Sequence, residues 1–419
     1  MAGTILVVNA GSSSIKFSLY ETGDGDTLSL ASKGQLYGIG AEPRLRAVDA
    51  RGAPLSDQKY SPDDVPDVST AMAIVGGWLR THLDGVWPVA VGHRVAHGGP
   101  AYASAALVDD AVLAALEQLV PLAPLHQPHN LGPIRTIQAR FPGTPQVACF
   151  DTAFHRGHPA VADRYALPEA LYQDGVRRYG FHGLSYEYIA RTLPRIAPEI
   201  AQGPVVVAHL GSGASMCAIR EGRSVDSTMG FTALDGLPMG TRCGQLDPGV
   251  VLHLLTQKGW SASEVERLLY RDAGLRGLSG VSNDVRDLLA SDAPAARLAL
   301  DYFVYRVGRE LGSLAAALGG IDALVLTAGI GENSPEVRAR VCARAEWLGL
   351  RLDATANRAG GPRISTLDSR VSVWVIPTDE ERMIAEHTLE VVTRPSGPLA
   401  RCRERDTTPR GDDEGRTGR

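Results

Sequence analysis

The chain contains short apolar runs separated by segments with helical spacing. Six runs have the length and residue types of buried β-strands, and they span residues 5–8, 89–91, 146–150, 205–208, 323–326 and 371–376. Between them, apolar residues at positions 112, 113, 116, 119 and 120 fall on one face of a helix, and residues 303–317 show the same spacing. Strands that alternate with helices predict an α/β fold.

Polar residues follow these predicted strands directly. They are Asn9, Arg94, Asp151, His209, Gly329 and Thr378. In open α/β sheets, ligands gather beyond the carboxyl ends of the strands. The functional site is therefore expected where these residues meet.

The first strand runs into a serine-rich segment, VVNAGSSSIKFSLY, at residues 7–20. Gly, Ser and Asn are ordinary residues of a hairpin turn. The same hydroxyls, with Lys16 beside them, also suit a cradle for phosphate. Residues 207–219, VAHLGSGASMCAI, align with residues 7–19 and set His209 opposite Asn9. Two such units could grip one phosphate chain from opposite sides, although so short an echo also arises by chance.

Composition narrows the classes of function. The 419 residues are 44% hydrophobic and 21% charged, which is ordinary for a globular protein of two or three domains. The net charge of -5 favours neither nucleic acid nor a membrane surface as a partner. Scattered cysteines without a C-x-x-C pair, no signal-peptide pattern and no long apolar run indicate a cytoplasmic protein that does not span a membrane. Residues 401–419 are too polar to order themselves and are expected to form a disordered tail.

Two common nucleotide-binding motifs and the protein-kinase catalytic loop are absent from the sequence. There is no G-x-x-x-x-G-K-[ST] loop, and GIGENS at residues 329–334 lacks the third glycine of a dinucleotide loop. GHRVAH lacks the aspartate of a protein-kinase catalytic loop. Residues 323–341 nevertheless predict a strand, a glycine-rich turn and a helix, with Ser334 as the N-cap and Pro335 as the first helical residue.

Four stretches combine a reactive side chain with nearby glycine or small residues. They are VGHRVAHGG with Arg94, ACFDTAFH with Asp151, RRYGFHGLS with His182 and MGTRCGQLDPG with Arg242. Each alone has an ordinary explanation, such as a surface arginine, a capping aspartate or a core histidine. Together with the serine turn they suit phosphoryl transfer, which needs positive charge around the phosphoryl oxygens and reactants held in line. Oxygen ligands with retained waters favour magnesium over zinc.

From residue 3 to about residue 393 the chain resembles the acetate kinases, which are short-chain carboxylate:ATP phosphotransferases. The motifs that carry the resemblance are NAGSSSIKFSLY, GHRVAHGG, FDTAFH, RRYGFHG, HLGSGAS, MGTRCG, TAGIGENS and IPTDEE. The resemblance implies two ribonuclease-H-like domains of the actin and sugar-kinase superfamily, with the active site in the cleft between them. It also implies lobes at residues 1–152 plus 382–400 and at residues 153–381, and a homodimer formed through the second lobe.

The resemblance further assigns roles to individual residues. It implies Asp151, His182, Arg242 and Arg94 as catalytic residues, with Asn9 and Glu380 at a Mg²⁺ site that could also take Mn²⁺. It implies a substrate pocket in which Arg94 holds the carboxylate of acetate, and in which the wall beside the methyl group is formed by Ala96, Leu125, Phe181 and Ala233. The residues implied in binding ATP are Ser12, Ser14, Lys16, His209, Leu210, Gly211, Ser212, Gly213, Asp284, Val285, Arg286, Gly329, Ile330, Gly331, Glu332 and Asn333.

The implied reaction is the reversible, ATP-dependent phosphorylation of acetate. Acetate is already an anion at neutral pH and needs no base, so Asp151 is expected to organise magnesium, water or His182. Ala96 and Ala233 stand where the family usually has valine and proline, which favours propionate or butyrate as an alternative substrate. Ser212, Gln127 and Asp379 each replace a usual asparagine. A non-catalytic nucleotide-binding regulator on the same fold, or an inactive relative, stays open as an alternative.

Overall fold

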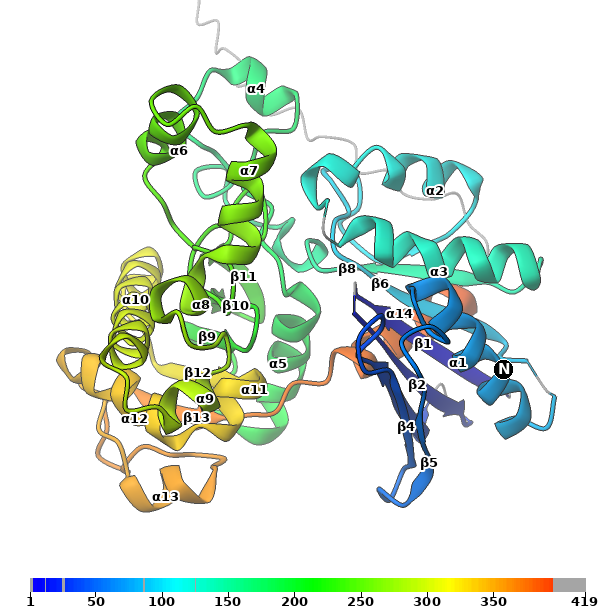
Figure 1. The fold of residues 1–419 in the computed structure, drawn as a ribbon. Helices are drawn as coiled ribbons and strands as arrows, with labels where there is room; N and C mark the ends of the chain where they lie inside the picture. The colour runs from blue at the N-terminus through cyan, green and yellow to red at the C-terminus, as the bar shows by residue number, and fades with distance from the viewer. Residues whose placement is uncertain (1–2, 12, 25–26, 86, 125, 395–419) are drawn as a thin grey trace, which may run out of the picture.

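The computed structural model describes residues 3–11, 13–24, 27–85, 87–124 and 126–394. They form two mixed β-sheets that lie side by side (Figure 1). The first sheet has the order β5-β4-β3-β2-β1-β6-β8-β7 and the second the order β11-β10-β9-β12-β13. The bounds are β1 Gly3–Ala10, β2 Ser14–Thr22, β3 Leu28–Tyr37, β4 Arg44–Asp49, β5 Pro54–Lys59, β6 Ala90–Val95, β7 Ala106–Leu107, β8 Gln146–Phe150, β9 Val205–Leu210, β10 Ala214–Arg220, β11 Arg223–Ser227, β12 Ala323–Thr327 and β13 Ser372–Val375.

The two sheets share one core arrangement. In each, the first strand is antiparallel to the second and parallel to the strand on its other side, so β2-β1-β6 corresponds to β10-β9-β12. Both opening hairpins are tight: Gly11 N donates to Ser14 O at 2.8 Å, and Gly211 N donates to Gly213 O at 3.1 Å. The short echo between residues 7–19 and 207–219 therefore reflects two equivalent β-hairpins.

Helices cover both faces of the first sheet. Alternate residues of β1 point to opposite faces, so Leu6 and Val8 pack towards α1 (Val68–His82), whereas Val7 packs against α14 (Glu380–Thr393). Helix α3 (Gln127–Arg140) lies beside α1 and supports α2 (Asp110–Glu117). The chain thus returns from the second sheet at its end to cover the first (Figure 1).

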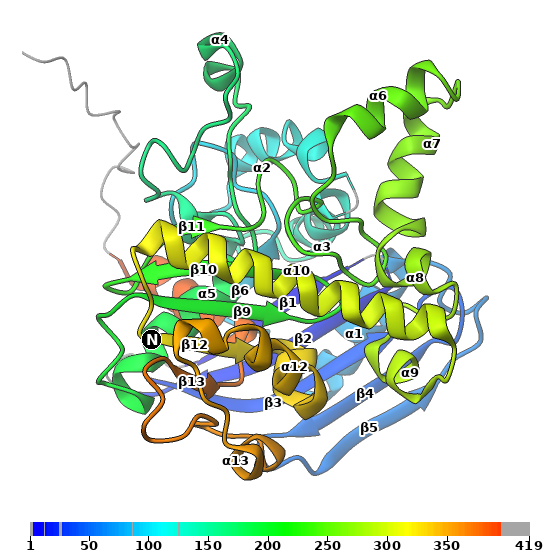
Figure 2. The same ribbon diagram turned by 90° about the vertical axis from the view of Figure 1, so that its left-hand side faces the viewer.

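The second sheet lies between α5 (Gly183–Ile196) and the long helix α10 (Pro294–Leu318). Figure 2 shows α6 and α7 projecting away from both sheets as an arm. The other helices are α4 Glu169–Gln173, α6 Pro248–Thr256, α7 Ala262–Arg267, α8 Gly274–Ser279, α9 Val285–Ala290, α11 Ala328–Asn333, α12 Pro335–Arg344 and α13 Ala354–Ala359. The predicted α/β class is confirmed.

Two local predictions were wrong. The helix expected through residue 120 ends at Glu117, and Val120–Leu122 forms a separate 3-10 turn. Pro121 explains the break, because proline lacks an N–H and disfavours helical backbone before it. The glycine-rich stretch after β12 is a short helix, α11, rather than a turn. Ser334 does cap the next helix, as predicted, by accepting a hydrogen bond from Val337 N.

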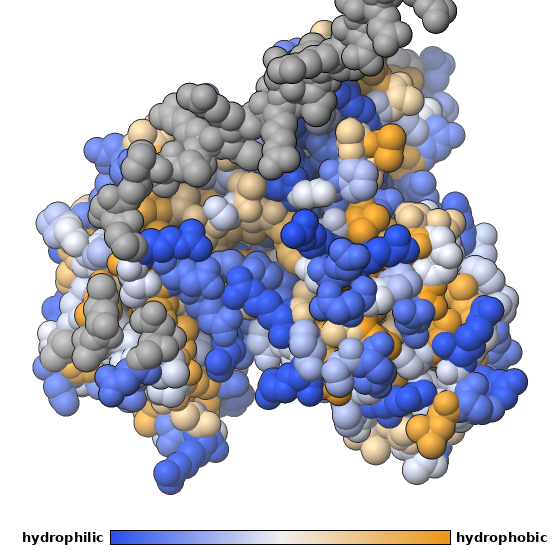
Figure 3. Space-filling model, turned by 180° about the vertical axis from the view of Figure 1, so that it is seen from behind, coloured by the Kyte–Doolittle hydropathy of each residue, from blue (hydrophilic) through white to orange (hydrophobic). Residues whose placement is uncertain are grey.

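The surface is mixed in character. Seen from behind, hydrophilic residues cover much of the molecule, with apolar residues scattered among them (Figure 3). Among the described residues, no helix has both the length and the apolar character needed to cross a bilayer.

Candidate active site

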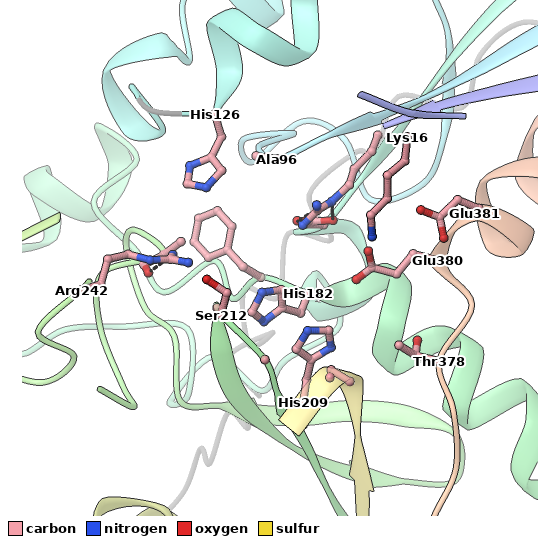
Figure 4. A pocket seen from close by; sticks show the side chains of 18 of the residues that line it. Lys16, Ala96, His126, His182, His209, Ser212, Arg242, Thr378, Glu380 and Glu381 are labelled. Carbon is pink, nitrogen blue, oxygen red and sulfur yellow. Dashed lines mark hydrogen bonds and ion pairs between the residues drawn. The ribbon is translucent and has the colours of Figure 1, made fainter. Parts of the chain in front are cut away.

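A cavity of about 490 Å³ lies at the carboxyl ends of the central strands of both sheets (Figure 4). Its wall combines cationic, imidazole, carboxylate and small side chains. The lining residues are Lys16, Arg94, Ala96, His126, Asp151, Phe181, His182, His209, Gly211, Ser212, Gly213, Ala233, Arg242, Ala328, Gly329, Glu332, Thr378, Glu380 and Glu381. Of the six polar residues that were expected to converge after the strands, all but Asn9 line this cavity.

Arg94 and Asp151 form a nearly buried ion pair on this wall. Arg94 Nη2 donates to Asp151 Oδ2 at 2.6 Å, and Arg94 Nε lies 3.0 and 3.2 Å from the two carboxylate oxygens. Burial lowers the pKa of Arg94, but the facing carboxylates of Asp151 and Glu380 outweigh it and hold the pKa above its ordinary value. Burial raises the pKa of Asp151, and Arg94 opposes that rise. The Arg94 guanidinium therefore stays charged at the cavity wall, in a position fixed by Asp151.

His182 enters the cavity from the first position before α5, where its backbone is left-handed with φ 58°. The next residue, Gly183, donates its N–H to Asp151 O at 2.8 Å, and a Cβ there would lie 2.2 Å from that oxygen. Only glycine fits, which explains the glycine after His182. The ring of His182 stacks on His209 with centroids 4.2 Å apart. Burial, then His209, Arg94 and Arg242, hold the pKa of His182 well below its usual range, so the ring is neutral.

Arg242 approaches from the opposite side of the cavity and is held by the loop beside it. Its Nη1 donates to Ala233 O at 2.7 Å. A Cβ at Gly213 would lie 2.8 Å from Arg242 Nη2 and 3.2 Å from His182 Nε2, so this glycine lets both groups close over the hairpin turn. Burial chiefly, with Arg94 adding to it, lowers the pKa of Arg242 to about 10, which leaves it charged at neutral pH.

The opposite end of the cavity carries Lys16 and two carboxylates. In the β1–β2 hairpin Lys16 pairs with Asn9, and its side chain reaches toward Glu380 (Figure 4). Within the described residues, Glu381 Oε1 and Thr378 Oγ1 are buried oxygens without a hydrogen-bond partner. Such unsatisfied oxygens point to a missing partner at this end of the cavity.

The side-chain oxygens of Asn9, Glu380 and Glu381 suit a magnesium ion. Over the described part of the chain, no group of three His, Cys, Asp or Glu residues forms a ready-made metal cage. Mg²⁺ does not require one, because it keeps several waters and takes one or two carboxylates together with substrate phosphates. The oxygens of Asn9, Glu380 and Glu381 are ligands of the right chemical type.

Helix α11 contributes Ala328, Gly329 and Glu332 to the cavity wall and is held in place by buried hydrogen bonds. Glu332 Oε1 accepts from Ala328 N at 2.8 Å and from Thr378 N at 3.2 Å, which ties together the ends of β12 and β13. Arg338, 1% exposed, donates through Nη1 to Gly331 O at 3.1 Å and to Glu332 O at 2.7 Å. Its other nitrogens donate to Asn357 Oδ1 at 2.7 Å and Asn357 O at 2.6 Å. This buried guanidinium fixes the last turn of α11.

Most predicted site residues line the cavity, but several do not. Asn9 lies just behind Arg94, with its Oδ1 3.5 Å from Arg94 Nη1. Asp284 caps the start of α9 and pairs with Arg286, away from the cavity wall. Ser12 and Leu125 lie outside the described residues. The other predicted residues that are absent from the wall are Ser14, Leu210, Val285, Ile330, Gly331 and Asn333.

The cavity also includes residues that the sequence reasoning did not assign. His126 is the residue before α3, and burial, then Arg242 and Arg94, lower its pKa to about 3. Glu381 directly follows Glu380 in the first turn of α14. The pair of adjacent acidic residues in the sequence could have identified Glu381 as a second candidate carboxylate. Thr378 had been noted only as a polar residue after a strand, and Ala328 carried no chemical signal.

Comparison with known proteins places these residues in a family. The model of the acetokinase family, Acetate_kinase, matches residues 4–386. The acetate kinase of Nitrobacter hamburgensis is 62% identical over 389 residues, covering 93% of this chain and 96% of that protein. The acetate kinase of Rhizobium meliloti is 56% identical over 392 residues, covering 94% of this chain and 99% of that protein.

Solved structures agree with the sequence matches. Porphyromonas gingivalis acetate kinase superimposes with a TM-score of 0.81 at 36% identity, covering 93% of this chain and 100% of that one. A propionate kinase from Francisella tularensis superimposes with a TM-score of 0.84 at 34% identity and the same coverage. Because the family model spans most of the chain and both relatives are more than half identical to it, the chain belongs to the acetokinase family.

Proposed function

We propose that this protein catalyses the reversible phosphorylation of acetate by ATP, which gives acetyl phosphate and ADP. The observation that carries the proposal is the convergence of Arg94, Arg242 and neutral His182 on one cavity between the two hairpins. Phosphoryl transfer proceeds through positioning and charge stabilisation rather than covalent chemistry by the protein. This cavity supplies both.

The two substrates enter from opposite ends. The acetate carboxylate lies against the Nη1 side of Arg94, with its methyl group toward Ala96, Phe181 and Ala233. The phosphates of ATP lie across the two hairpin turns, near Lys16 and Gly211. A carboxylate oxygen attacks the γ-phosphorus in line, and the bond from that phosphorus to the β–γ bridging oxygen breaks, which releases ADP. No proton moves, so the site needs no general base.

Charge stabilisation then divides among the side chains. Arg242 Nη2 and His182 Nε2 both face Gly213, so they are placed to donate to oxygens of the transferring phosphoryl group. Asp151 orients Arg94 and does not abstract a proton. A Mg²⁺ ion, or Mn²⁺ in its place, would be held by Asn9 and Glu380 with Glu381 and would neutralise charge on the phosphate chain.

A specific observation favours propionate as a second candidate substrate. The wall beside the acetate site carries Ala96 and Ala233, and both side chains are small. One methylene in an apolar pocket changes discrimination by about 1–3 kcal/mol. Butyrate would need still more room and is ranked below propionate.

The proposal extends to assembly and location. Helix α6 is largely apolar, yet none of its residues is buried, and Leu252 is 60% exposed. An unpartnered apolar helix of this kind suits a homodimer contact. Sedimentation of the native protein and of Leu252→Glu tests it, because a monomer in both would exclude this contact.

A cytoplasmic location fits the ATP substrate and the free thiols of Cys149, Cys217, Cys243 and Cys342.

We also place the lobe boundaries as the sequence suggested, at residues 1–152 plus 382–400 and at residues 153–381. The packing of α14 on β1, β6 and β8 supports assigning residues 382–393, all of this helix except its first two residues, to the first lobe. Residues 1–2 and 395–400, and the predicted tail at residues 401–419, lie outside the described residues. Limited proteolysis in the absence of nucleotide, with mapping of the first cleavages, tests these boundaries. The first cleavages are expected where the chain passes from one lobe to the other, near residues 152 and 382. Early cleavage inside β9 or β12 would count against these boundaries.

A direct assay tests the proposed function. The protein is incubated with ATP, Mg²⁺ and acetate, propionate or butyrate in parallel, and acyl phosphate is trapped as the hydroxamate. Acyl phosphate that forms with acetate and requires Mg²⁺ supports the proposal. A protein that binds ATP but forms no acyl phosphate with any of these acids would be a nucleotide-binding regulator or an inactive relative.

A further inference from the structure

Behind His182, away from the cavity, lies a short chain of buried hydroxyl groups. Ser215 Oγ on β10 is 2.7 Å from His182 Nδ1 and 2.5 Å from the hydroxyl of Tyr186. His182 and Tyr186 are four residues apart at the start of α5, so both side chains reach the same serine. Ser215 and Tyr186 are 0% exposed and His182 is 8% exposed. These direct hydrogen bonds are therefore shielded from bulk solvent.

The protons of these three groups can be assigned by counting donors. Tyr186 and Ser215 each have one hydroxyl proton, and neutral His182 has one ring proton. Over the described residues, the tyrosine hydroxyl has Ser215 as its hydrogen-bond partner, so its proton goes to Ser215 Oγ. The serine proton then goes to His182 Nδ1, which accepts it. Any other arrangement leaves a buried hydroxyl proton without an acceptor, which is costly.

The geometry points to a relay, Tyr186 to Ser215 to His182, that fixes the histidine as the Nε2–H tautomer and aims that N–H at the transferring phosphoryl group. We therefore assign Ser215 and Tyr186 as positioning residues for the reaction, and this inference rests on the proposed function. The hydrogen bond made by one ring nitrogen decides which form the other takes. In the opposite tautomer Nε2 would present a lone pair to phosphoryl oxygens and repel them.

The surroundings of His182 make the tautomer important. Arg94 and Arg242 help to keep the ring neutral, so it has a single N–H to donate. Nε2 lies on the side of Gly213 and Arg242 Nη2, which is the cavity side. Stacking on His209 prevents the ring from tilting away. The relay behind the ring is thus the element that selects its single donor.

Neutron diffraction from deuterated crystals of the wild-type protein near neutral pH tests the proton assignment without any mutation. The relay predicts deuterium on His182 Nε2, none on Nδ1, and the Ser215 deuterium directed at Nδ1. Deuterium on Nδ1 would overturn the assignment, whether or not Nε2 also carried one. Because this readout is independent of catalysis, it stands even if the protein forms no acyl phosphate.

Kinetics test the consequence for the reaction. Ser215→Ala should lower kcat by about tenfold, with KM for ATP and acetate within about twofold, because loss of an outer hydrogen-bond partner misaligns the donor but removes no substrate contact. Tyr186→Phe keeps the ring volume and should lower kcat by a smaller factor, about threefold. An unchanged kcat in a folded Ser215→Ala protein would refute the positioning role.

Ser224 offers a matched control. It is also a buried serine bonded to histidines, with its Oγ 2.8 Å from His155 Nδ1 and 2.6 Å from His158 Nε2, but it lies outside the cavity wall. Ser224→Ala should leave kcat within twofold. Equal losses in Ser224→Ala and Ser215→Ala would show a general packing effect and overturn the relay. No activity in the wild-type protein would instead refute the proposed function, while the neutron result would still decide the tautomer.

Discussion

The guanidinium of Arg94 donates hydrogen bonds from Nε and Nη2 to the carboxylate of Asp151, at distances of 2.6 to 3.2 Å, and its Nη1 lies beside Asn9. Asp151 therefore occupies one edge of the guanidinium, whereas Nη1 makes a longer hydrogen bond, of 3.5 Å, to Asn9 Oδ1. The side chain of Asp151 is 3% exposed, so this charge-assisted contact is shielded from water. The structure thus gives Asp151 a partner that the sequence did not predict.

Asp151→Asn tests whether the carboxylate orients Arg94 or acts as a base. The amide keeps the volume but loses the charge, so Arg94 should swing away. We expect kcat to fall by about 100-fold and KM for acetate to rise, with the shape of the pH–rate profile unchanged. Loss of one ionisation from that profile would indicate a base instead.

Asp163 provides the control for that change. It forms another buried pair, with Arg156 Nη2 2.8 Å from its Oδ1, at a distance from the cavity wall. Asp163→Asn should lower stability without lowering kcat by more than about twofold.

Arg242→Ala and His182→Ala should each lower kcat by about 10²–10³-fold, because each removes a donor already aimed at the phosphoryl group. Both proteins should keep the circular dichroism spectrum of the wild type. Steady-state kinetics of acyl phosphate formation provide the measurement. Turnover near the wild-type rate in either variant would contradict the assignment of that residue.

Ala96→Val should narrow the pocket next to the substrate methyl group. Ala96 is 6% exposed, and its N–H is fixed by Asn130 Oδ1 at 2.9 Å, so the backbone cannot retreat. We expect kcat/KM for propionate to fall about tenfold relative to that for acetate, as the loss of room for one methylene implies. An unchanged ratio of the two substrates would place the methyl group elsewhere.

Arg338→Met should destabilise the protein and weaken ATP binding together. Four hydrogen bonds to Gly331, Glu332 and Asn357 would be lost, three of them fully buried, and Asn357 O would keep only the longer bond from Gly360 N at 3.3 Å. The expected cost is about 3 kcal/mol or more, with KM for ATP raised and KM for acetate unchanged.

Denaturant unfolding and substrate titration measure these effects. Arg340 on the same helix pairs with Glu336 at 2.8 Å at the surface, so Arg340→Met should change stability by less than about 1 kcal/mol. Equal effects in the two variants would remove the special role of Arg338.

Stability should fall as the solution becomes acidic. Burial first of all lowers the pKa of His93 to about 4 and those of His97 and His155 to about 3, whereas the unfolded chain binds these protons near the ordinary value of 6.5. The stabilisation that comes from keeping these histidines neutral is therefore fully present above pH 6.5 and is lost as pH falls toward 3. Each histidine should remove about 1.4 kcal/mol per pH unit within that window.

Denaturant unfolding between pH 7.5 and 5 measures that slope. Replacing one such residue, as in His155→Gln, should reduce the slope of unfolding free energy against pH by about 1.4 kcal/mol per pH unit, the effect of one proton. This change is expected whatever the effect of the substitution on stability at neutral pH. A stability that is flat over this range would contradict neutral burial of the histidines.

The sequence predicted the central strands well because they are buried on both faces and so read as uniform apolar runs. Gln146–Phe150 was predicted to the residue. Strand β5 could not be predicted in this way, because Pro54–Lys59 is exposed along nearly its whole length and carries no apolar pattern. The two-residue strand β7 is too short to give any periodic signal.

In the site, too, some residues could be predicted from the sequence and others could not. Arg94, Asp151, His182 and Arg242 stand out because reactive side chains adjoin small residues or a strand end. Arg338 and Ser215 give no such signal, since an arginine on a helix and a serine on a strand are commonplace. Their roles arise only when distant segments meet, such as α12 with α13 and α5 with β10.

The central claim is that the two sheets enclose one centre where a carboxylate and the end of ATP meet. A crystal structure with ADP, Mg²⁺, fluoroaluminate and acetate tests it most directly. The account predicts that the fluoroaluminate lies between ADP and acetate, within hydrogen-bond distance of Arg94, Arg242 and His182. Fluoroaluminate bound with these three side chains turned away from it would contradict the account.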